Sequence, residues 1–168
     1  RGANFDEMLQ SSRSSRQVTD TLGSVLSYLA DPLHRGHLEA TYNALRSTWP
    51  TPGGPGDPAN VSLLLRSCYR PETLLFPAPG AKPQDALPPA GKRDPLDMEA
   101  IGVVAGLLRR WMRATALPVD QLLLTVAQDI MAEAELSRAQ KLASHLRLIA
   151  DQNPDWRLPE LARELVQI

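Results

Sequence analysis

The histidines and the single cysteine are the first residues to test for catalytic or metal-binding chemistry. His34, His37 and Glu39 form an H-x-x-H-x-E string, and two imidazoles at i and i+3 of a helix can bind zinc. The string offers no third imidazole within one turn, so we interpret it as two exposed histidines beside a helix start. His145 has no acidic residue three or four positions away. Cys68 follows an apolar run at helical spacing, which predicts a buried thiol rather than a nucleophile.

The chain contains no recognisable nucleotide-binding motif. A phosphate loop needs the spacing G-x-x-x-x-G-K-[ST], but Gly91-Lys92 is followed by Arg93, and Ala86 occupies the place of the first glycine. Without that cradle of backbone N–H groups we expect no ATP site. We therefore expect neither a cofactor nor a metal in this chain.

Basic residues are the remaining candidates for a binding site. The net charge is only −1, but 15 of the 18 basic residues are arginine, which suits bidentate phosphate contacts. A GC-rich coding sequence explains the same bias. Arg109, Arg110 and Arg113 form one group, and Arg138 and Lys141 share the polar side of a later helix. Such groups can track a phosphate backbone, or they are solvated helix faces, and both interpretations stay open.

The elements that position these residues are predicted to be helices. Apolar residues recur at helical spacing, and no alternating Val, Ile or aromatic pattern predicts a confident strand. The fold class is therefore all-α, an irregular bundle of about seven helices with room for one short strand at the N-terminus. The predicted helices run over residues 14–30, 34–48, 58–69, 95–115, 118–131 and 133–152, and a seventh begins at 158.

Two segments break this helical pattern. The first dozen residues are predicted to be an entry strand or loop. Residues 77–95 contain six prolines and two glycines in 19 positions, which excludes a helix or a central strand. We predict a flexible Pro/Gly-rich insert there, because Leu87 is the only large apolar residue it has to bury.

Size and composition indicate one globular domain, residues 1–168. A chain of this length buries roughly 70% of its unfolded surface, and its 43% hydrophobic and 22% charged residues are typical. It has no 18-residue apolar run, so we expect no membrane partner. One cysteine fits a reducing, cytoplasmic location. The chain opens at Arg1-Gly2 without a Met and stops inside an apolar helical pattern, so we expect a piece of a longer protein.

Both ends of the chain carry strings that match a known family. The opening has R-G-x-x-F-x-E at residues 1–7, Q-V-T-D-x-L at 17–22 and L-S-Y-L-A-D-P at 26–32. The end has L-P-V-D-Q-L-L at 117–123 and P-D-W-R-L-P at 154–159. This pattern resembles the entry and the end of the inserted 2B domain of UvrD/Rep/PcrA-type superfamily 1 DNA helicases. It departs from the family at Met8, where the family has Arg, and at Gln17, where it has an acidic residue.

The resemblance implies a helical accessory domain that swivels on a helicase motor. ATP and Mg²⁺ would be bound, and ATP hydrolysed, by the motor domains of the same chain, and DNA unwinding would belong to the parent enzyme. This domain would contact DNA weakly, or protein partners. The family's Gly-Ile-Gly turn, which touches duplex DNA, is replaced by P-G-G-P-G at 52–56 without a nearby Lys or Arg, so that contact is not carried over.

Two other classes of function stay open. The chain can be a helical protein-interaction or regulatory module unrelated to DNA. It can also be a stand-alone enzyme, which would require His34, His37 or His145 to meet an acid or a metal in a pocket.

Overall fold

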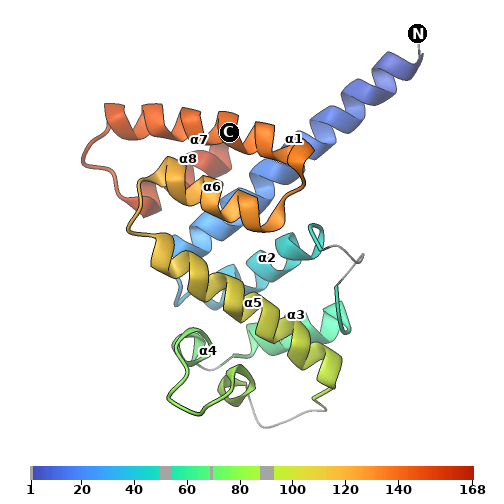
Figure 1. Ribbon diagram of the computed structural model, residues 1–168, viewed down its shortest axis with the longest axis vertical. Helices are drawn as coiled ribbons and strands as arrows, with labels where there is room; N and C mark the ends of the chain where they lie inside the picture. Colours follow the sequence, from blue (N-terminus) through green and yellow to red (C-terminus); the bar gives the residue numbers. More distant parts are fainter. Residues whose placement is uncertain (1, 50–53, 69, 88–92) are drawn as a thin grey trace.

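The computed structural model describes residues 2–49, 54–68, 70–87 and 93–168, and of residues 2–13, 83 and 84 it describes the backbone alone. These described residues form eight α-helices and one short 3₁₀ helix with no strand, which confirms the predicted all-α bundle (Figure 1). In chain order the elements are α1 (Gly2–Ala30), α2 (Arg35–Arg46), α3 (Pro58–Arg66), α4 (Pro71–Leu75), η1 (Pro83–Ala86), α5 (Pro95–Ala114), α6 (Val119–Ile130), α7 (Glu133–Gln152) and α8 (Leu158–Gln167).

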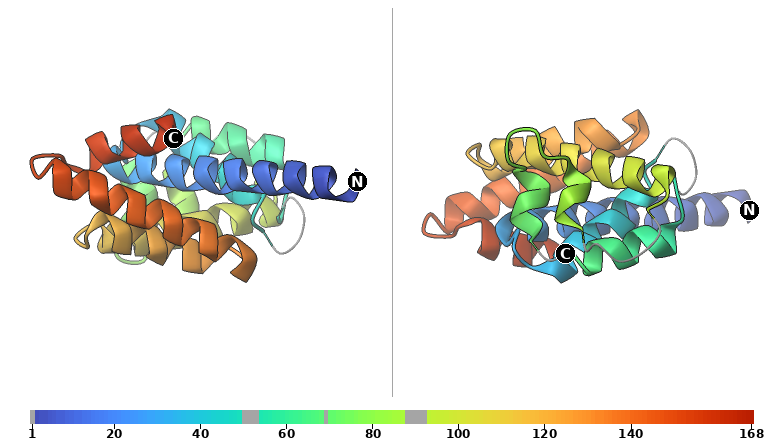
Figure 2. Two further views of the ribbon diagram at one scale, coloured as in Figure 1. Left: turned by 90° about the horizontal axis from the view of Figure 1, so that it is seen from above. Right: turned by 90° about the horizontal axis from the view of Figure 1, so that it is seen from below.

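Helix α1 is the axis of the bundle, because α2, α5, α6, α7 and α8 all contact it. Helices α6, α7 and α8 gather at one end of the molecule, and α2, α3, α4 and η1 at the other (Figures 1 and 2). Helix α5 contacts α3, α4 and η1 as well as α1 and α6, so it joins the two groups. The first turns of α1 extend beyond the other helices (Figure 1).

Aspartate caps fix where α3 and α5 begin. The Asp57 side chain accepts the Ala59 N–H at 3.1 Å, and Asp94 accepts the Leu96 N–H at 2.8 Å. A proline follows each cap, where its fixed φ suits the first helical turn and its missing N–H costs nothing. Such a cap contributes about 1 kcal/mol to helix stability. The predicted start of α5 at Asp94-Pro95 is therefore confirmed.

The core is built from the apolar stripes that the periodicity predicted. Trp111, Tyr28 and Tyr42 are the largest fully buried side chains among the described residues. Fully burying one large apolar side chain contributes about 1.5–3 kcal/mol. The predicted stripe of α1 is buried along its whole length, at Val18, Leu22, Val25, Leu26 and Leu29.

The expected strand or loop at the N-terminus is wrong, because α1 already begins at Gly2. Residues 2–13 lack the alternating β-branched and aromatic pattern of a strand, and no proline occurs before Pro32. A lone strand would also leave its backbone N–H and C=O groups without a neighbouring strand to pair with. The helix satisfies these groups locally.

The middle of the chain holds two short helices that the sequence did not predict: α4 lies before the predicted insert at 77–95, and η1 lies within it. Helix α4 and η1 pack against each other and against α5, and both were missed because they span one turn. Leu87, the one large apolar residue of the predicted insert, is 4% exposed. The Arg93 guanidinium donates to the Leu87 carbonyl at 3.1 Å. Residues 88–92 lie outside the described residues, and the predicted flexibility of 77–95 stays a prediction.

The Gly-rich turn before α3 is held by two packed side chains. Residues 50–53 lie outside the described part, but Gly54 and Gly56 have φ values of +69° and +82°, which glycine adopts without strain. A Cβ on Gly54 would lie 2.8 Å from the Trp49 indole, and one on Gly56 would collide with the Asp97 carboxylate. Asp97 also accepts the Asp57 N–H at 2.7 Å. The turn is thus fixed to the first turn of α5.

Candidate nucleic-acid interface

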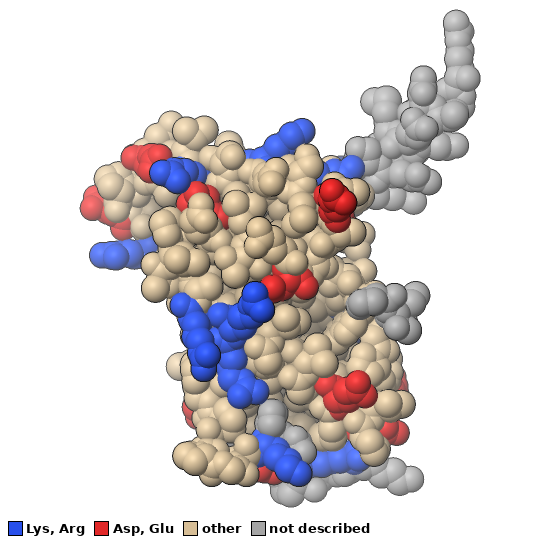
Figure 3. Space-filling model, in the orientation of Figure 1, with Lys and Arg blue, Asp and Glu red and all other residues tan. Residues whose placement is uncertain are grey.

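Helix α5 presents the first predicted basic group on the side opposite to its core contacts. Its buried residues, from Ala100 to Trp111, lie along one stripe. Arg109, Arg110 and Arg113 lie off that stripe, with Arg110 and Arg113 exposed and Arg109 half-buried. The largest group of basic side chains in Figure 3 covers the C-terminal half of α5. We call Arg109, Arg110 and Arg113 the α5 basic face.

The three guanidinium groups of the α5 basic face differ in how firmly they are held. The Arg109 Nε donates to the Ala105 carbonyl of its own helix at 3.4 Å. The Arg110 Nε lies 3.1 Å from Asp129 Oδ2, and the Arg110 side chain remains 66% exposed. Arg113 is exposed and makes no ion pair with any described residue. The face can therefore offer N–H donors to an anion.

The buried Trp111 indole packs on the core side of α5, opposite the α5 basic face. The Trp111 side chain is fully buried, and its Nε1–H donates to Asp129 Oδ2 at 2.8 Å. Asp129 thus accepts from Trp111 and pairs with Arg110. These contacts join the C-terminal half of α5 to α6. Trp111 was expected to pack. The role of Asp129 was missed, because nothing in the local sequence relates it to Trp111 and Arg110, which lie 18 and 19 positions earlier.

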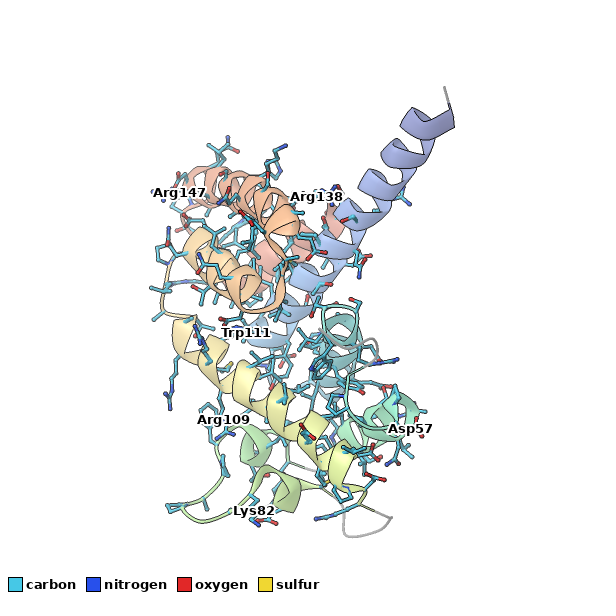
Figure 4. The ribbon with its side chains drawn as sticks, turned by 45° about the vertical axis from the view of Figure 1, so that its right-hand side comes forward. Asp57, Lys82, Arg109, Trp111, Arg138 and Arg147 are labelled. Carbon is cyan, nitrogen blue, oxygen red and sulfur yellow. The ribbon has the colours of Figure 1, made fainter. Side chains whose placement is uncertain are left out.

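In the second predicted basic group, Arg138 and Lys141, the arginine makes a contact within the fold. The Arg138 guanidinium of α7 donates to the Ser14 hydroxyl of α1. Lys141 is exposed on the same helix. Arg147, further along α7, pairs with Asp120 of α6 at 3.1 Å. Arg138 and Arg109 lie in well-separated parts of the molecule (Figure 4), so the two groups do not form one basic stripe.

The histidines of the predicted string form a helix cap. The His34 Nδ1 accepts the His37 N–H at 3.3 Å, and the two rings stack with their centroids 4.2 Å apart. Within the described ranges, no group of three or more His, Cys, Asp or Glu side chains is arranged to hold a metal ion. His145 is exposed on α7.

Burial raises the pKa of three groups in the core, the hydroxyls of Tyr28 and Tyr42 and the thiol of Cys68. Burial raises the pKa of the Tyr28 hydroxyl well above its ordinary value of 10.0, and the neighbouring Cys68 raises it further. Burial likewise raises the pKa of the Cys68 thiol above 9.0. Cys68 is fully buried, which confirms its predicted position. A buried thiol with a raised pKa is a poor nucleophile at neutral pH, because the thiolate is the reactive form.

Comparisons with protein-family models, curated proteins and solved structures found no match to this chain. None of the described helices combines the length and apolar character needed to cross a bilayer. The described residues form an all-α bundle with an arginine-rich face on α5.

Proposed function

We propose that this chain is a non-catalytic 2B-type accessory domain of an ATP-dependent DNA helicase. The α5 basic face would contact the phosphate backbone of DNA. ATP and Mg²⁺ would act in the motor domains of the same protein, and this domain would bias the motor between conformations while offering surface to DNA or a partner. The observation that carries the DNA contact is the α5 basic face itself.

The chemistry of this face suits a phosphodiester backbone. Arg109, Arg110 and Arg113 lie off the buried stripe of one helix, and guanidinium groups bind phosphate oxygens bidentately. Neither the sequence nor the fold contains a known motif that would place these arginines in a groove of DNA to contact base edges. We therefore expect weak binding without sequence preference. Non-specific contacts of this kind give a Kd of about 1 µM or weaker.

The test is DNA binding measured against salt. We expect a short fluorescein-labelled duplex to bind the domain at low salt, with a slope of log Kobs against log salt near −2.7, at about −0.9 for each of three contacts. Affinity would then fall about 40-fold between about 50 and 200 mM salt. Binding that is equally tight at both salt concentrations would contradict a phosphate contact.

A charge-matched pair of variants assigns the contact to the α5 basic face. The variant Arg109→Glu/Arg110→Glu/Arg113→Glu should lose the salt-dependent binding and keep its helical circular dichroism. The control Arg66→Glu/Arg157→Glu/Arg163→Glu changes the net charge equally at exposed positions on α3, at the start of α8 and on α8. Equal losses in both variants would mean that net charge alone attracts DNA, and the proposed site would be wrong.

ATP hydrolysis gives a second, separate test. We expect the isolated domain to release no phosphate from ATP with Mg²⁺, with or without DNA. Robust turnover by the purified domain would overturn the assignment of catalysis to other domains.

A further inference from the structure

Helix α5 carries a second regular stripe, on the side that faces away from the core. Five exposed residues follow one another along this side, at Glu99, Val103, Gly106, Arg110 and Arg113. Their spacing alternates between four and three residues, which aligns them along one side of an α-helix. We call these five residues the outer stripe of α5. Its last two members also belong to the α5 basic face.

The two ends of the outer stripe carry opposite charges. Glu99 lies in the first half of α5, and Arg113 lies about four turns, or about 21 Å, further along the helix. Neither side chain makes an ion pair with a residue that the structure describes. Arg110 is paired with Asp129 of α6 but remains 66% exposed. A stripe with an unpaired acid at one end and an unpaired base at the other is complementary to a copy of itself rotated by 180°.

The middle of the outer stripe is small and apolar. Val103 is 39% exposed, and Gly106 and the neighbouring Gly102 have no side chain. A Cβ at either glycine would contact nothing within 4 Å beyond the backbone of its own helix, so packing within the described chain does not require glycine there. Mid-helix glycine destabilises a helix relative to alanine. It allows a second backbone to approach closely.

We propose that two copies of this chain associate through their outer stripes, with the two α5 helices antiparallel about a two-fold axis at Gly106. Gly106 is midway between Glu99 and Arg113, so each Glu99 pairs with Arg113 of the second copy, and the pair forms twice. The aliphatic stem of Arg110 covers Val103 of the second copy. A two-fold dimer uses the same patch on both copies, which a self-complementary stripe provides.

The charges of the outer stripe favour this arrangement over the alternatives. A parallel pair of helices would bring Glu99 beside Glu99 and Arg113 beside Arg113, and like charges at such positions are destabilising. A nucleic acid strand laid along the whole stripe would be repelled by Glu99 and would gain nothing from Val103. Only an antiparallel second copy pairs both ends of the stripe.

The dimer goes beyond the proposed DNA contact and does not depend on it. One helix face is smaller than the roughly 800 Å² per partner of a standard protein interface, so we expect weak and reversible association. The two interactions share Arg110 and Arg113. A chain within the dimer therefore has these arginines covered and cannot offer the whole α5 basic face to DNA.

Sedimentation equilibrium of the purified chain, from about 10 µM to about 1 mM, measures the association. The parent should change from monomer to dimer over this range, and a parent that stays monomeric would overturn the proposal. Glu99→Arg and Arg113→Glu each replace both attractive pairs with repulsive ones, and each should raise the dimer Kd about tenfold or more. The controls Asp155→Arg and Arg157→Glu make the same charge changes at exposed positions before α8 and should dimerise like the parent.

A mixture of two variants tests the antiparallel pairing. Glu99→Arg has arginine at both ends of the stripe, and Arg113→Glu has glutamate at both ends, so each repels itself. Mixed in equal amounts, they form two attractive pairs, and the mixture should dimerise within about threefold of the parent Kd. A mixture of Asp155→Arg and Arg157→Glu has the same net charges and should associate no more tightly than the parent. If the first mixture does not recover association, the antiparallel pairing is wrong.

Gly106→Leu separates the dimer from the DNA contact. The added side chain has open space in the free chain but blocks the approach of the second helix, so it should raise the dimer Kd about tenfold or more. It changes no arginine, so duplex binding by dilute protein should stay within about twofold. Loss of DNA binding in every protein, with the sedimentation results as expected, would remove the DNA contact and leave the dimer. If Gly106→Leu and both single charge variants dimerise like the parent, the outer stripe is not the interface.

Discussion

Helices α5 and α7 are both 20 residues long and both carry a basic group, yet their arginines have different roles. On α7, Arg138 reaches Ser14 of α1, and Arg147 reaches Asp120 of α6. On α5, the basic face is bordered by solvent, and only Arg110 pairs with a neighbouring helix. Arg110 and Arg147 each pair with an α6 aspartate at 3.1 Å, so the helices differ in the other two arginines: Arg138 is bonded to α1, whereas Arg113 makes no ion pair with a described residue.

The largest expected effect tests what holds the α5 basic face in place. Trp111→Ala removes a fully buried indole and should lower the free energy of unfolding by about 3–5 kcal/mol. Urea denaturation followed by circular dichroism measures it. Trp111→Phe keeps most of the volume and loses the bond to Asp129, so its cost should be smaller, about 1–3 kcal/mol. A neutral Trp111→Ala would show that α5 is held by other contacts.

The next effect tests the opposite end of α5. The buried Asp97 carboxylate accepts the Asp57 N–H at 2.7 Å and the Asn60 Nδ2 at 2.5 Å. Asp97→Ala leaves these donors without their acceptor and should cost about 2–3 kcal/mol in the same urea measurement. Glu99→Ala, at an exposed position of the same helix, is the control and should change stability by less than about 0.5 kcal/mol. Equal effects would mean that Asp97 acts only through the helix dipole.

A smaller pair of effects tests the comparison directly. Arg138→Ala breaks the link to Ser14 and should cost about 1 kcal/mol of stability while leaving duplex binding unchanged. Arg113→Ala should leave stability within about 0.5 kcal/mol and make the salt slope of duplex binding shallower by about 0.9. Denaturation and anisotropy on the same two proteins give all four values. If Arg138→Ala also lowers the salt slope, α7 belongs to the DNA contact and the distinction between the helices fails.

Sequence reasoning was strongest where the apolar spacing is long and regular. The stripe of Ile101, Val104 and Leu108 predicted both the extent of α5 and its buried side, and Asp94-Pro95 predicted its start. Local spacing also placed Arg109, Arg110 and Arg113 on the outer side of that helix. It could not distinguish their role from that of Arg138, because the partner that holds Arg138 is 124 residues away in the chain. One-turn elements such as α4 were missed because a single turn has no period to detect.

The last effect concerns Tyr28, a core residue on α1, the helix that both α5 and α7 contact. The Tyr28 hydroxyl has no hydrogen-bond partner among the described residues, so Tyr28→Phe should change stability by less than about 1 kcal/mol at pH 7. At high pH the two proteins should differ. Burial raises the folded-state pKa of Tyr28, so its contribution is fully present below the unfolded pKa near 10 and is lost as pH rises above it.

This alkaline loss of stability distinguishes the core from the α5 basic face and from the arginine contacts of α7. Cys68, whose pKa is also raised, should begin to reduce stability above about pH 9 in both proteins. Above pH 10 the parent should lose up to about 1.4 kcal/mol more per pH unit than Tyr28→Phe, measured by urea denaturation at stepped pH. Arginine keeps its charge throughout this range, so neither the α5 basic face nor the arginine contacts of α7 can cause the difference. Equal losses of stability in both proteins would mean that a group other than Tyr28 causes the alkaline destabilisation.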